Sequence, residues 1–445
     1  MKPLFTLLLL ALACATPIVD AANWPQFRGP NQDGSSPETG LPAKFSKTEG
    51  VKWTANLPGP SASVPAIWGD KVFLTSADAS NKHLVGICLD AKTGKEVWNV
   101  VVSEGYQHDS SSNLASPSPA TNGELVFFYY GNSTLAAFDF AGKEVWKRDL
   151  GHDYGRFGTQ WTYSTSPVLD GAKLYIQVLE RNHPFEFQGM PKGDPNGKNE
   201  SYILALNPKD GKTIWRHIRP STAMEESLEA FSTPSFTTFD GKRLMLVAGG
   251  DTLSAHEAET GAEVWRLESW NPSKIGHWRL VPSPVAGDGV AIACAPKNEP
   301  VYAAALGSYG EVKPLWASNP KGGVTSDVSS PAFYQGKFYV LDSNHKTLAC
   351  VDPKTGKPMW VGELPSKGKI EASPTVADGK VYMVNFFGEV FVAKADPGQF
   401  ELLNVGDFGD GSKMTKGDTV VRTSVVAANG DLFIRVKDKL YCVGK

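Results

Sequence analysis

"LDAKTGKEVW" (residues 89–98) decides the fold, because four further segments of the chain repeat its pattern. These copies are "FDFAGKEVW" (138–146), "LNPKDGKTIW" (206–215), "HEAETGAEVW" (256–265) and "VDPKTGKPMW" (351–360). Weaker copies end at Trp53 and Trp316, and "ADPGQFELL" (395–403) has Leu403 in place of the tryptophan. Eight copies roughly 50 residues apart indicate one supersecondary unit repeated along the chain.

A second phrase, in most copies Ser-Pro followed by an Asp-Gly turn, alternates with the first and also occurs eight times. Two examples are "SPVLDG" (166–171) and "SPTVADG" (373–379). Asp or Asn with Pro and Gly is turn chemistry, and the apolar or alternating segments between these turns are typical of strands. Each unit therefore reads as four short antiparallel strands. A two-sheet sandwich is the alternative, but eight such units favour a radial propeller.

The two ends of the repeat region complement each other. Residues 423–445 supply three strands and no tryptophan strand, whereas "EGVKWTANL" (49–57) supplies a tryptophan strand with no strand before it. We therefore expect an all-β fold over residues 51–445. This fold is an eight-bladed β-propeller of four-stranded antiparallel blades, closed by pairing the N-terminal strand with the C-terminal strands. Residues 22–50 form an N-terminal arm.

The Asp-x-x-Thr-Gly-x-x-x-Trp phrase, in an eightfold ring, resembles the PQQ-like, quinoprotein-type β-propeller family, and within it the BamB-like members. The resemblance covers about residues 51–443. It implies tryptophan-docking repeats, in which each outer-strand tryptophan packs against the neighbouring blade. These structural tryptophans are Trp53, Trp98, Trp146, Trp215, Trp265, Trp316 and Trp360. WD40 propellers are the main rival, and they fit poorly because no repeat tryptophan is followed by Asp.

The first residues have the order of a secretory signal. Lys2 precedes an apolar run over about residues 4–15, and small residues follow; the run is too short to span a bilayer. We expect residues 1–21 to be a signal peptide cleaved after Ala21, with a lipid anchor at Cys14 in "ALAC" as the alternative. We expect a periplasmic or secreted protein, with association with the outer membrane as a further option. No transmembrane span is expected after cleavage of the signal peptide.

Charge and cysteine content exclude some classes of function. The formal net charge is −3, with 44 Lys+Arg against 47 Asp+Glu, so no basic excess favours nucleic acid as a partner. Four cysteines follow the signal, an even number that suggests disulfides in a secreted chain. Three of them, in "GICLD", "LACVD" and "LYCVG", share one repeat position where other copies have alanine. We therefore expect small buried residues rather than disulfides.

The two faces of the ring differ in their loops. In a four-strand meander the first and third turns share one face, and here those turns are short and uniform. The other face carries the second turns, the long blade crossings and an insertion at residues 181–201, and long loops on a rigid scaffold often bind ligands. We expect the residues just before the Ser-Pro strands to rim the channel mouth there. These candidate binding residues are Trp161, Tyr163, Glu229, Arg279, Asp327, Glu371 and Arg422.

Two interpretations of this rim remain open. Its charged members pair to satisfy a polar channel, or the rim is a ligand or peptide site with aromatic stacking and charged anchors. No catalytic residue, metal site or cofactor is predicted, because the chain has no vicinal Cys pair, no His-x-x-x-His and no Gly-x-Ser-x-Gly.

The resemblance implies a monomeric, noncatalytic scaffold that binds a protein partner in the cell envelope, as BamB-like proteins do in outer-membrane protein assembly. The same resemblance also brings the alternative of a dehydrogenase for alcohols or sugars that uses PQQ with calcium. A third alternative is a carbohydrate-binding propeller that uses the aromatic rim.

The arm contains the dense stretch "NWPQFRGPNQDG" (23–34). Because the chain enters the closing blade at its tryptophan strand, the arm joins the ring from the face of short turns. We therefore expect Trp24, Phe27 and Arg28 to pack against that face or to plug the far end of the channel. The alternative is that these three residues form a ligand site.

Overall fold

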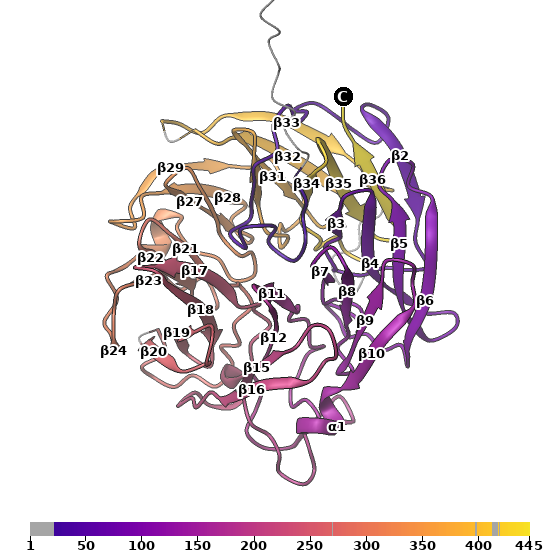
Figure 1. Ribbon diagram of the computed structural model, residues 1–445. Helices are drawn as coiled ribbons and strands as arrows, with labels where there is room; N and C mark the ends of the chain where they lie inside the picture. The colour runs from indigo at the N-terminus through magenta and orange to yellow at the C-terminus, as the bar shows by residue number, and fades with distance from the viewer. Residues whose placement is uncertain (1–21, 269, 397, 412–416, 418) are drawn as a thin grey trace, which may run out of the picture.

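The computed structural model describes residues 22–445 except 269, 397, 412–416 and 418 (Figure 1). Eight four-stranded antiparallel sheets surround a central axis, which confirms the eight-bladed propeller. The expected signal peptide and Cys14 lie outside the described residues. None of the helices formed by the described residues is long and apolar enough to cross a membrane.

The blades are named by their innermost strands, and each runs outward from the axis. The first four are β3 (Ala66–Trp68), β4 (Lys71–Asp78), β5 (His83–Asp90), β6 (Glu96–Glu104); β7 (Ala120–Thr121), β8 (Leu125–Tyr129), β9 (Thr134–Asp139), β10 (Glu144–Asp149); β11 (Val168–Asp170), β12 (Lys173–Val178), β15 (Tyr202–Leu206), β16 (Thr213–Ile218); and β17 (Ser235–Phe239), β18 (Lys242–Gly249), β19 (Thr252–Glu257), β20 (Glu263–Leu267). A fifth short strand, β24 (Gly310–Glu311), adds in parallel to the outer edge of β20.

The other four blades complete the ring. They are β21 (Val285–Gly287), β22 (Val290–Cys294), β23 (Val301–Ala305), β25 (Trp316–Ala317); β26 (Ala332–Tyr334), β27 (Lys337–Asp342), β28 (Thr347–Val351), β29 (Pro358–Glu363); β30 (Thr375–Ala377), β31 (Lys380–Val384), β32 (Glu389–Lys394), β33 (Leu402–Asp407); and β34 (Val426–Ala428), β35 (Asp431–Val436), β36 (Lys439–Val443), β2 (Val51–Asn56). In the last blade the N-terminal strand β2 pairs antiparallel with β36, as the sequence predicted.

Each repeat tryptophan docks on the next blade through its indole N–H, which donates to a backbone carbonyl in that blade's outer turn. The seven acceptors are the carbonyls of Ala91, Phe140, Pro208, Glu259, Leu306, Pro353 and Asp396. The glycine of the turn lies under the ring: a Cβ on Gly94 would come within 2.4 Å of the Trp53 ring. Glycine is therefore needed in the Thr-Gly turn for two reasons: the turn has a positive φ, +68° at Gly94, and the indole ring approaches too closely for a side chain.

The Ser-Pro phrase builds a second connection between blades, a belt of hydrogen bonds around the axis. In each case the backbone N–H before the Pro donates to the hydroxyl at the same position of the next blade, at 2.9–3.1 Å. The hydroxyls of this belt belong to Ser118, Ser166, Thr233, Ser283, Ser330, Ser373 and Ser424. The eighth position is Val64, which has no hydroxyl, so the belt is interrupted between the β34 and β3 blades.

The N-terminal arm enters the ring and closes one end of the channel. Strand β1 (Ser35–Ser36) pairs in parallel with β30 on its axial side, and Figure 1 shows the indigo arm inside the circle of inner strands. Arm residues hydrogen-bond to seven inner strands, at Ile67, Thr121, Leu169, Phe236, Phe333, Val376 and Ala427. Leu41 donates to the carboxylate of Asp378, which belongs to a short turn. The arm thus plugs the channel from the face of short turns.

Arg28 fixes the plug from inside. Its guanidinium is buried and donates to the carbonyls of Pro374 (2.9 Å) and Pro331 (2.5 Å), which belong to two neighbouring blades. Burial lowers the pKa of Arg28 to about 10, with Asp33 opposing the shift. Trp24 is also buried, and its backbone forms two hydrogen bonds with Ile67. These contacts agree with the expected role of the arm as a plug.

The interior of the ring is divided into apolar clusters that lie between neighbouring blades. The four described cysteines lie in these clusters as free, buried thiols: Cys88, Cys294, Cys350 and Cys442. Burial raises the pKa of each of them. The expectation of small buried residues rather than disulfides is confirmed.

Candidate functional site

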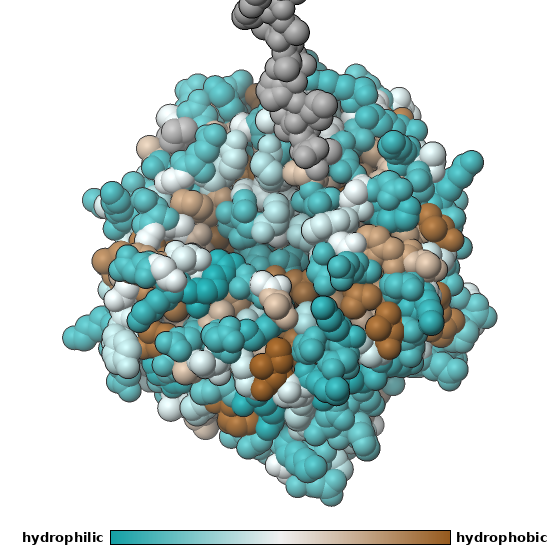
Figure 2. Space-filling model, in the orientation of Figure 1, coloured by the Kyte–Doolittle hydropathy of each residue, from teal (hydrophilic) through white to brown (hydrophobic). Residues whose placement is uncertain are grey.

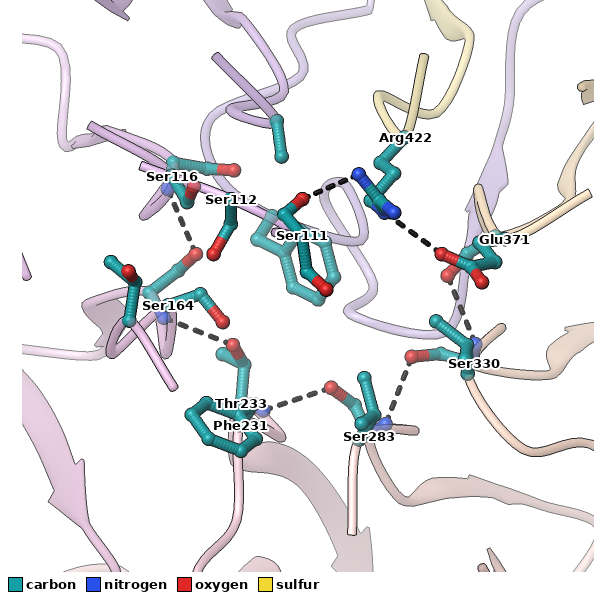
Figure 3. Close-up of a pocket in the computed structure, with 18 of the residues that line it drawn as sticks. Ser111, Ser112, Ser116, Ser164, Phe231, Thr233, Ser283, Ser330, Glu371 and Arg422 are labelled. Carbon is teal, nitrogen blue, oxygen red and sulfur yellow. Dashed lines mark hydrogen bonds and ion pairs between the residues drawn. The ribbon is translucent and has the colours of Figure 1, made fainter. Parts of the chain in front are cut away.

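A cavity of about 240 Å³ occupies the open end of the channel, on the face of long loops. Its lining includes Phe27 of the arm and the belt hydroxyls. Figure 3 labels Thr233, Ser283 and Ser330 of the belt. Because the arm closes the other end, the channel is a blind cup rather than a tunnel.

One repeat position lines the cup, two residues before each belt position. Side chains alternate along an extended strand, so this position and the belt position face the axis together. The eight residues there are Ala62, Ser116, Ser164, Phe231, Val281, Val328, Glu371 and Arg422. The neighbours Phe231, Val281 and Val328 form an apolar arc, whereas the other five carry small, hydroxyl or charged side chains.

The structure brings Glu371 and Arg422 together across two blades. Nε of Arg422 donates to Oε2 of Glu371 at 2.8 Å, and the guanidinium also donates to the carbonyls of Ser111 and Gly417 (Figure 3). The guanidinium lies 4.9 Å from the centroid of the Phe386 ring. This ion pair therefore closes one side of the cup and ties together the loops around it.

Trp161 and Arg279 also line the cup, and both contact the carboxylate of Glu226. The Trp161 indole N–H donates to Oε1 at 3.0 Å, and Nε of Arg279 lies 3.6 Å from the same oxygen. Trp161 also lines a second cavity, of about 260 Å³, between residues 104–114 and the insertion. Trp161 and its neighbour Thr162 thus line both cavities.

The insertion at residues 181–201 is an ordered element beside the cup. It contains the hairpin β13 (Phe185–Phe187) and β14 (Met190–Lys192). The Phe187 ring meets Trp161 edge-on, with 5.1 Å between ring centroids. Neighbouring crossings carry the short helices α1 (Leu150–Tyr154) and η1 (Glu225–Leu228), and η2 (Pro320–Gly322) lies in the β21 blade's last crossing.

Arg181 holds the insertion to the ring. It donates to Glu229 at 2.7 Å and to Gln160 at 2.7 Å, and its guanidinium lies 4.0 Å from the centroid of the Phe185 ring. Burial raises the pKa of Glu229 to about 7, although Arg181 opposes this shift. Burial also raises the pKa of the adjacent Glu180 to about 8. Two buried carboxyl groups therefore support the base of the hairpin.

Three of the candidate rim residues do not line the cup. Tyr163 is 1% exposed, packs between Phe157 and Tyr129, and donates its hydroxyl to the carbonyl of Gln177. Glu229 is fully buried under the insertion. Asp327 accepts the backbone N–H of Lys297 at 2.7 Å and does not line the cup. These placements correct the expected rim.

The correction has a simple physical reason. Tyr163 and Asp327 stand three residues before the belt position, so the alternation of the strand turns them away from the axis. Counting in steps of two from each Ser-Pro would have found the residues that sequence reasoning missed: Ala62, Ser116, Ser164, Phe231, Val281 and Val328. No local pattern pointed to Phe27 as a cup residue, since that role depends on where the arm enters.

The residues present do not fit a calcium ion beside a quinone. Glu371 is the single carboxylate lining the cup within the described part of the chain, and it is bound to Arg422. The described residues also contain no group of three or more His, Cys, Asp or Glu side chains close enough to hold a metal ion.

Comparisons with known proteins place the chain among propellers of two kinds. Polyvinylalcohol dehydrogenase of a Pseudomonas species is 26% identical over 260 residues, 52% of this chain and 37% of that protein. The chain thus spans little more than a third of that relative. The outer membrane protein assembly factor BamB of Yersinia pestis is 23% identical over 312 residues, 68% of each chain. The crystal structure of BamB from Moraxella catarrhalis aligns with a TM-score of 0.55 and 13% identity, covering 88% of this chain and 96% of that one.

The family match extends over most of the repeat region. Residues 42–181 and 199–442 match the family described as outer membrane protein assembly factor BamB, and the unmatched gap falls within the insertion. The likeness to the solved structure supports the propeller fold. The chain therefore belongs to the BamB family of PQQ-like β-propellers.

Proposed function

We propose that this protein is a noncatalytic binding protein whose loop-rich face holds a protein partner in the cell envelope. The observation that carries the proposal is the anchored hairpin β13–β14. It is an addition to one blade of an otherwise regular ring, and buried polar contacts fix its position.

The anchoring lowers the cost of binding. An interface element that is already ordered loses little conformational entropy when the partner arrives. Arg181 contacts Glu229, Gln160 and Glu225, and the Phe187 ring rests on Trp161. The hairpin is therefore presented in one position rather than selected from many.

The chemistry of this region suits a protein surface. Met190 on the hairpin is 40% exposed, and Met224 in the neighbouring crossing is 53% exposed. Methionine side chains adapt to a partner's apolar surface, and polar groups surround them. On the face that Figure 2 shows, from which the N-terminal arm enters, the surface is mostly hydrophilic and hydrophobic residues form small separate groups. The two exposed methionines on the loop-rich face support a modest interface there, such as that of a reversible partner.

The family match supports a proposal for the location and the class of process. BamB proteins are named as outer membrane protein assembly factors, so we propose that this chain acts on the periplasmic side of such a membrane, as a monomer. The proposal assigns it no quinone, metal or nucleic acid. The candidate binding residues that line the cup, Trp161, Arg279, Glu371 and Arg422, would lie beneath the bound partner.

Site-specific photocrosslinking in cells tests the proposal. A photoreactive amino acid is placed at Met190, and at Tyr309 as a matched control, since Tyr309 is 86% exposed in the segment between β23 and β25. We expect one discrete crosslinked protein from position 190 and none from position 309. Arg181→Met, which releases the hairpin, should weaken the crosslink. Equal crosslinking at both positions, or no product at 190, would show that the face is not a docking surface.

A further inference from the structure

The cup contains many hydroxyl groups with unused hydrogen-bonding capacity. All seven belt hydroxyls accept a backbone N–H, and none donates to an acceptor among the described residues. Higher in the cup, the hydroxyls of Ser111, Ser112, Thr162 and Ser164 belong to half-buried residues and form no hydrogen bond with any described group. Water or a ligand is needed to complete the hydrogen bonding of both sets of hydroxyls.

The walls of the cup differ in polarity. The arc formed by Phe231, Val281 and Val328 is apolar, and Phe27 adds an apolar ring at the base. The rest of the wall carries Ser111, Ser112 and Ser164 together with the Glu371–Arg422 pair (Figure 3). A molecule that fits both walls has one apolar side and a rim of hydroxyl groups.

The charges around the cup balance. Arg422 is paired with Glu371 at 2.8 Å, and Arg279 lies 3.6 Å from Glu226. A ligand with a net charge would have to break one of these pairs or face an uncompensated like charge. A neutral ligand leaves both pairs intact.

We propose that the cup is a binding site for a single neutral sugar ring. A pyranose has an apolar face of C–H groups and a rim of hydroxyls, each of which donates and accepts hydrogen bonds. The cavity of about 240 Å³ is smaller than the roughly 300–1,000 Å³ typical of drug-sized ligands, so one ring fits the size better than an oligosaccharide. Trp161 stands at the mouth, where a second ring of a longer glycan would emerge.

Saturation-transfer NMR on the full chain tests this site. The probes are D-glucose, D-galactose, D-mannose and N-acetyl-D-glucosamine, with D-glucuronate and D-galacturonate as charged counterparts. We expect a saturable signal from at least one neutral sugar and a weaker one from its uronate. The triple variant Ser111→Ala, Ser112→Ala, Ser164→Ala should bind that sugar at least tenfold more weakly, because three hydroxyl partners are lost.

Two further variants separate the site from nonspecific effects. Val281→Trp fills the cup from its apolar wall and should abolish the signal, whereas Ser80→Ala, at an exposed serine outside the cavity, should leave it unchanged. A circular dichroism spectrum that matches wild type establishes that each variant is folded. No saturable signal from any neutral sugar, an unchanged affinity in the triple variant, or tighter binding of a uronate would overturn the proposal. This result is independent of crosslinking at Met190.

Discussion

Replacing Arg28 with methionine should release the N-terminal plug without unfolding the ring. Methionine retains an apolar stem but removes the guanidinium, which donates to the carbonyls of Pro331 and Pro374 at 2.5 and 2.9 Å. These bonds link the arm to two blades at once. Their loss leaves both carbonyls without this donor in a buried place, so the docked arm loses its strongest polar contacts.

The magnitude follows from the two bonds. A hydrogen bond to a charged group contributes about 1.5–3 kcal/mol, so the loss of two such bonds costs about 3–6 kcal/mol. We use the lower limit because the variant regains the desolvation cost of the buried cation, which lowers the pKa of Arg28 to about 10. Since about 1.4 kcal/mol corresponds to a factor of ten, opening of the arm should become roughly a hundredfold more frequent.

Hydrogen exchange detected by mass spectrometry measures how often the arm opens. Peptides that cover residues 22–38 should exchange roughly a hundredfold faster in Arg28→Met, because the N–H of Trp24, which donates to the carbonyl of Ile67, loses protection when the arm leaves. Peptides from outer strands such as β6 should be unaffected. Lys44→Met removes an exposed charge from the same arm and serves as the control. Equal exchange of the arm in wild type and Arg28→Met, or faster exchange in every blade, would refute the reasoning.

Three further variants test other parts of the architecture. Gly211→Ala should destabilise the protein by about 1–3 kcal/mol more than Gly241→Ala in chemical denaturation, because both glycines have a positive φ (+69° and +74°) but a Cβ on Gly211 alone would approach the Trp146 ring, at 2.7 Å. Ser330→Ala should lower the free energy of unfolding by about 1–2 kcal/mol, because a buried N–H in the belt loses its acceptor. Burial raises the pKa of the Glu180 carboxyl from its ordinary 4.5 to about 8, so the folded protein binds a proton there more tightly than the unfolded chain does. The free energy of unfolding should therefore fall as pH rises from about 4.5 to 8. Glu180→Gln should reduce that fall by a few kcal/mol at most.

Each of these expectations has a contrary outcome. Equal destabilisation by the two glycine substitutions would mean that the docked ring contributes nothing beyond backbone strain. A Ser330→Ala protein as stable as wild type would show that water replaces the belt hydroxyl. Identical stability profiles of wild type and Glu180→Gln between pH 5 and about 8 would place the proton elsewhere.

The sequence was sufficient for the ring, because its physical causes are local and repeated. The tryptophan, the turn glycine and the turn acid stand at fixed spacing, so the seven docking contacts follow from one phrase. Closure of the ring also follows from the sequence, because the single tryptophan strand near the N-terminus and the three strands at the C-terminus together make one complete blade. The belt was visible as Ser-Pro, but its hydrogen bonds join positions about 50 residues apart, which no local pattern describes.

The site was predicted less well for a geometric reason. Proximity to Ser-Pro in the sequence selects Tyr163 and Asp327, but the alternation of side chains along the strand turns both away from the axis. Glu229 is buried beneath an insertion whose fold no local pattern predicts. Glu371 and Arg422 stand at the position that faces the axis, and the structure pairs them. Their role in binding stays a prediction.

The plug also sets an order of events in folding. Its partners lie on seven inner strands, and the hydrogen bond from Ser36 to Ala427 joins residues 391 positions apart in the chain. Loop closure over such separations is slow, and here the partners have no fixed positions relative to one another until the ring is complete. The residues that leave the ribosome early are therefore the last to find their place. A ring that closes with a neighbouring molecule's strand, or that lacks a blade, would leave residues 22–38 accessible to proteases, so the arm reports on the completeness of the propeller.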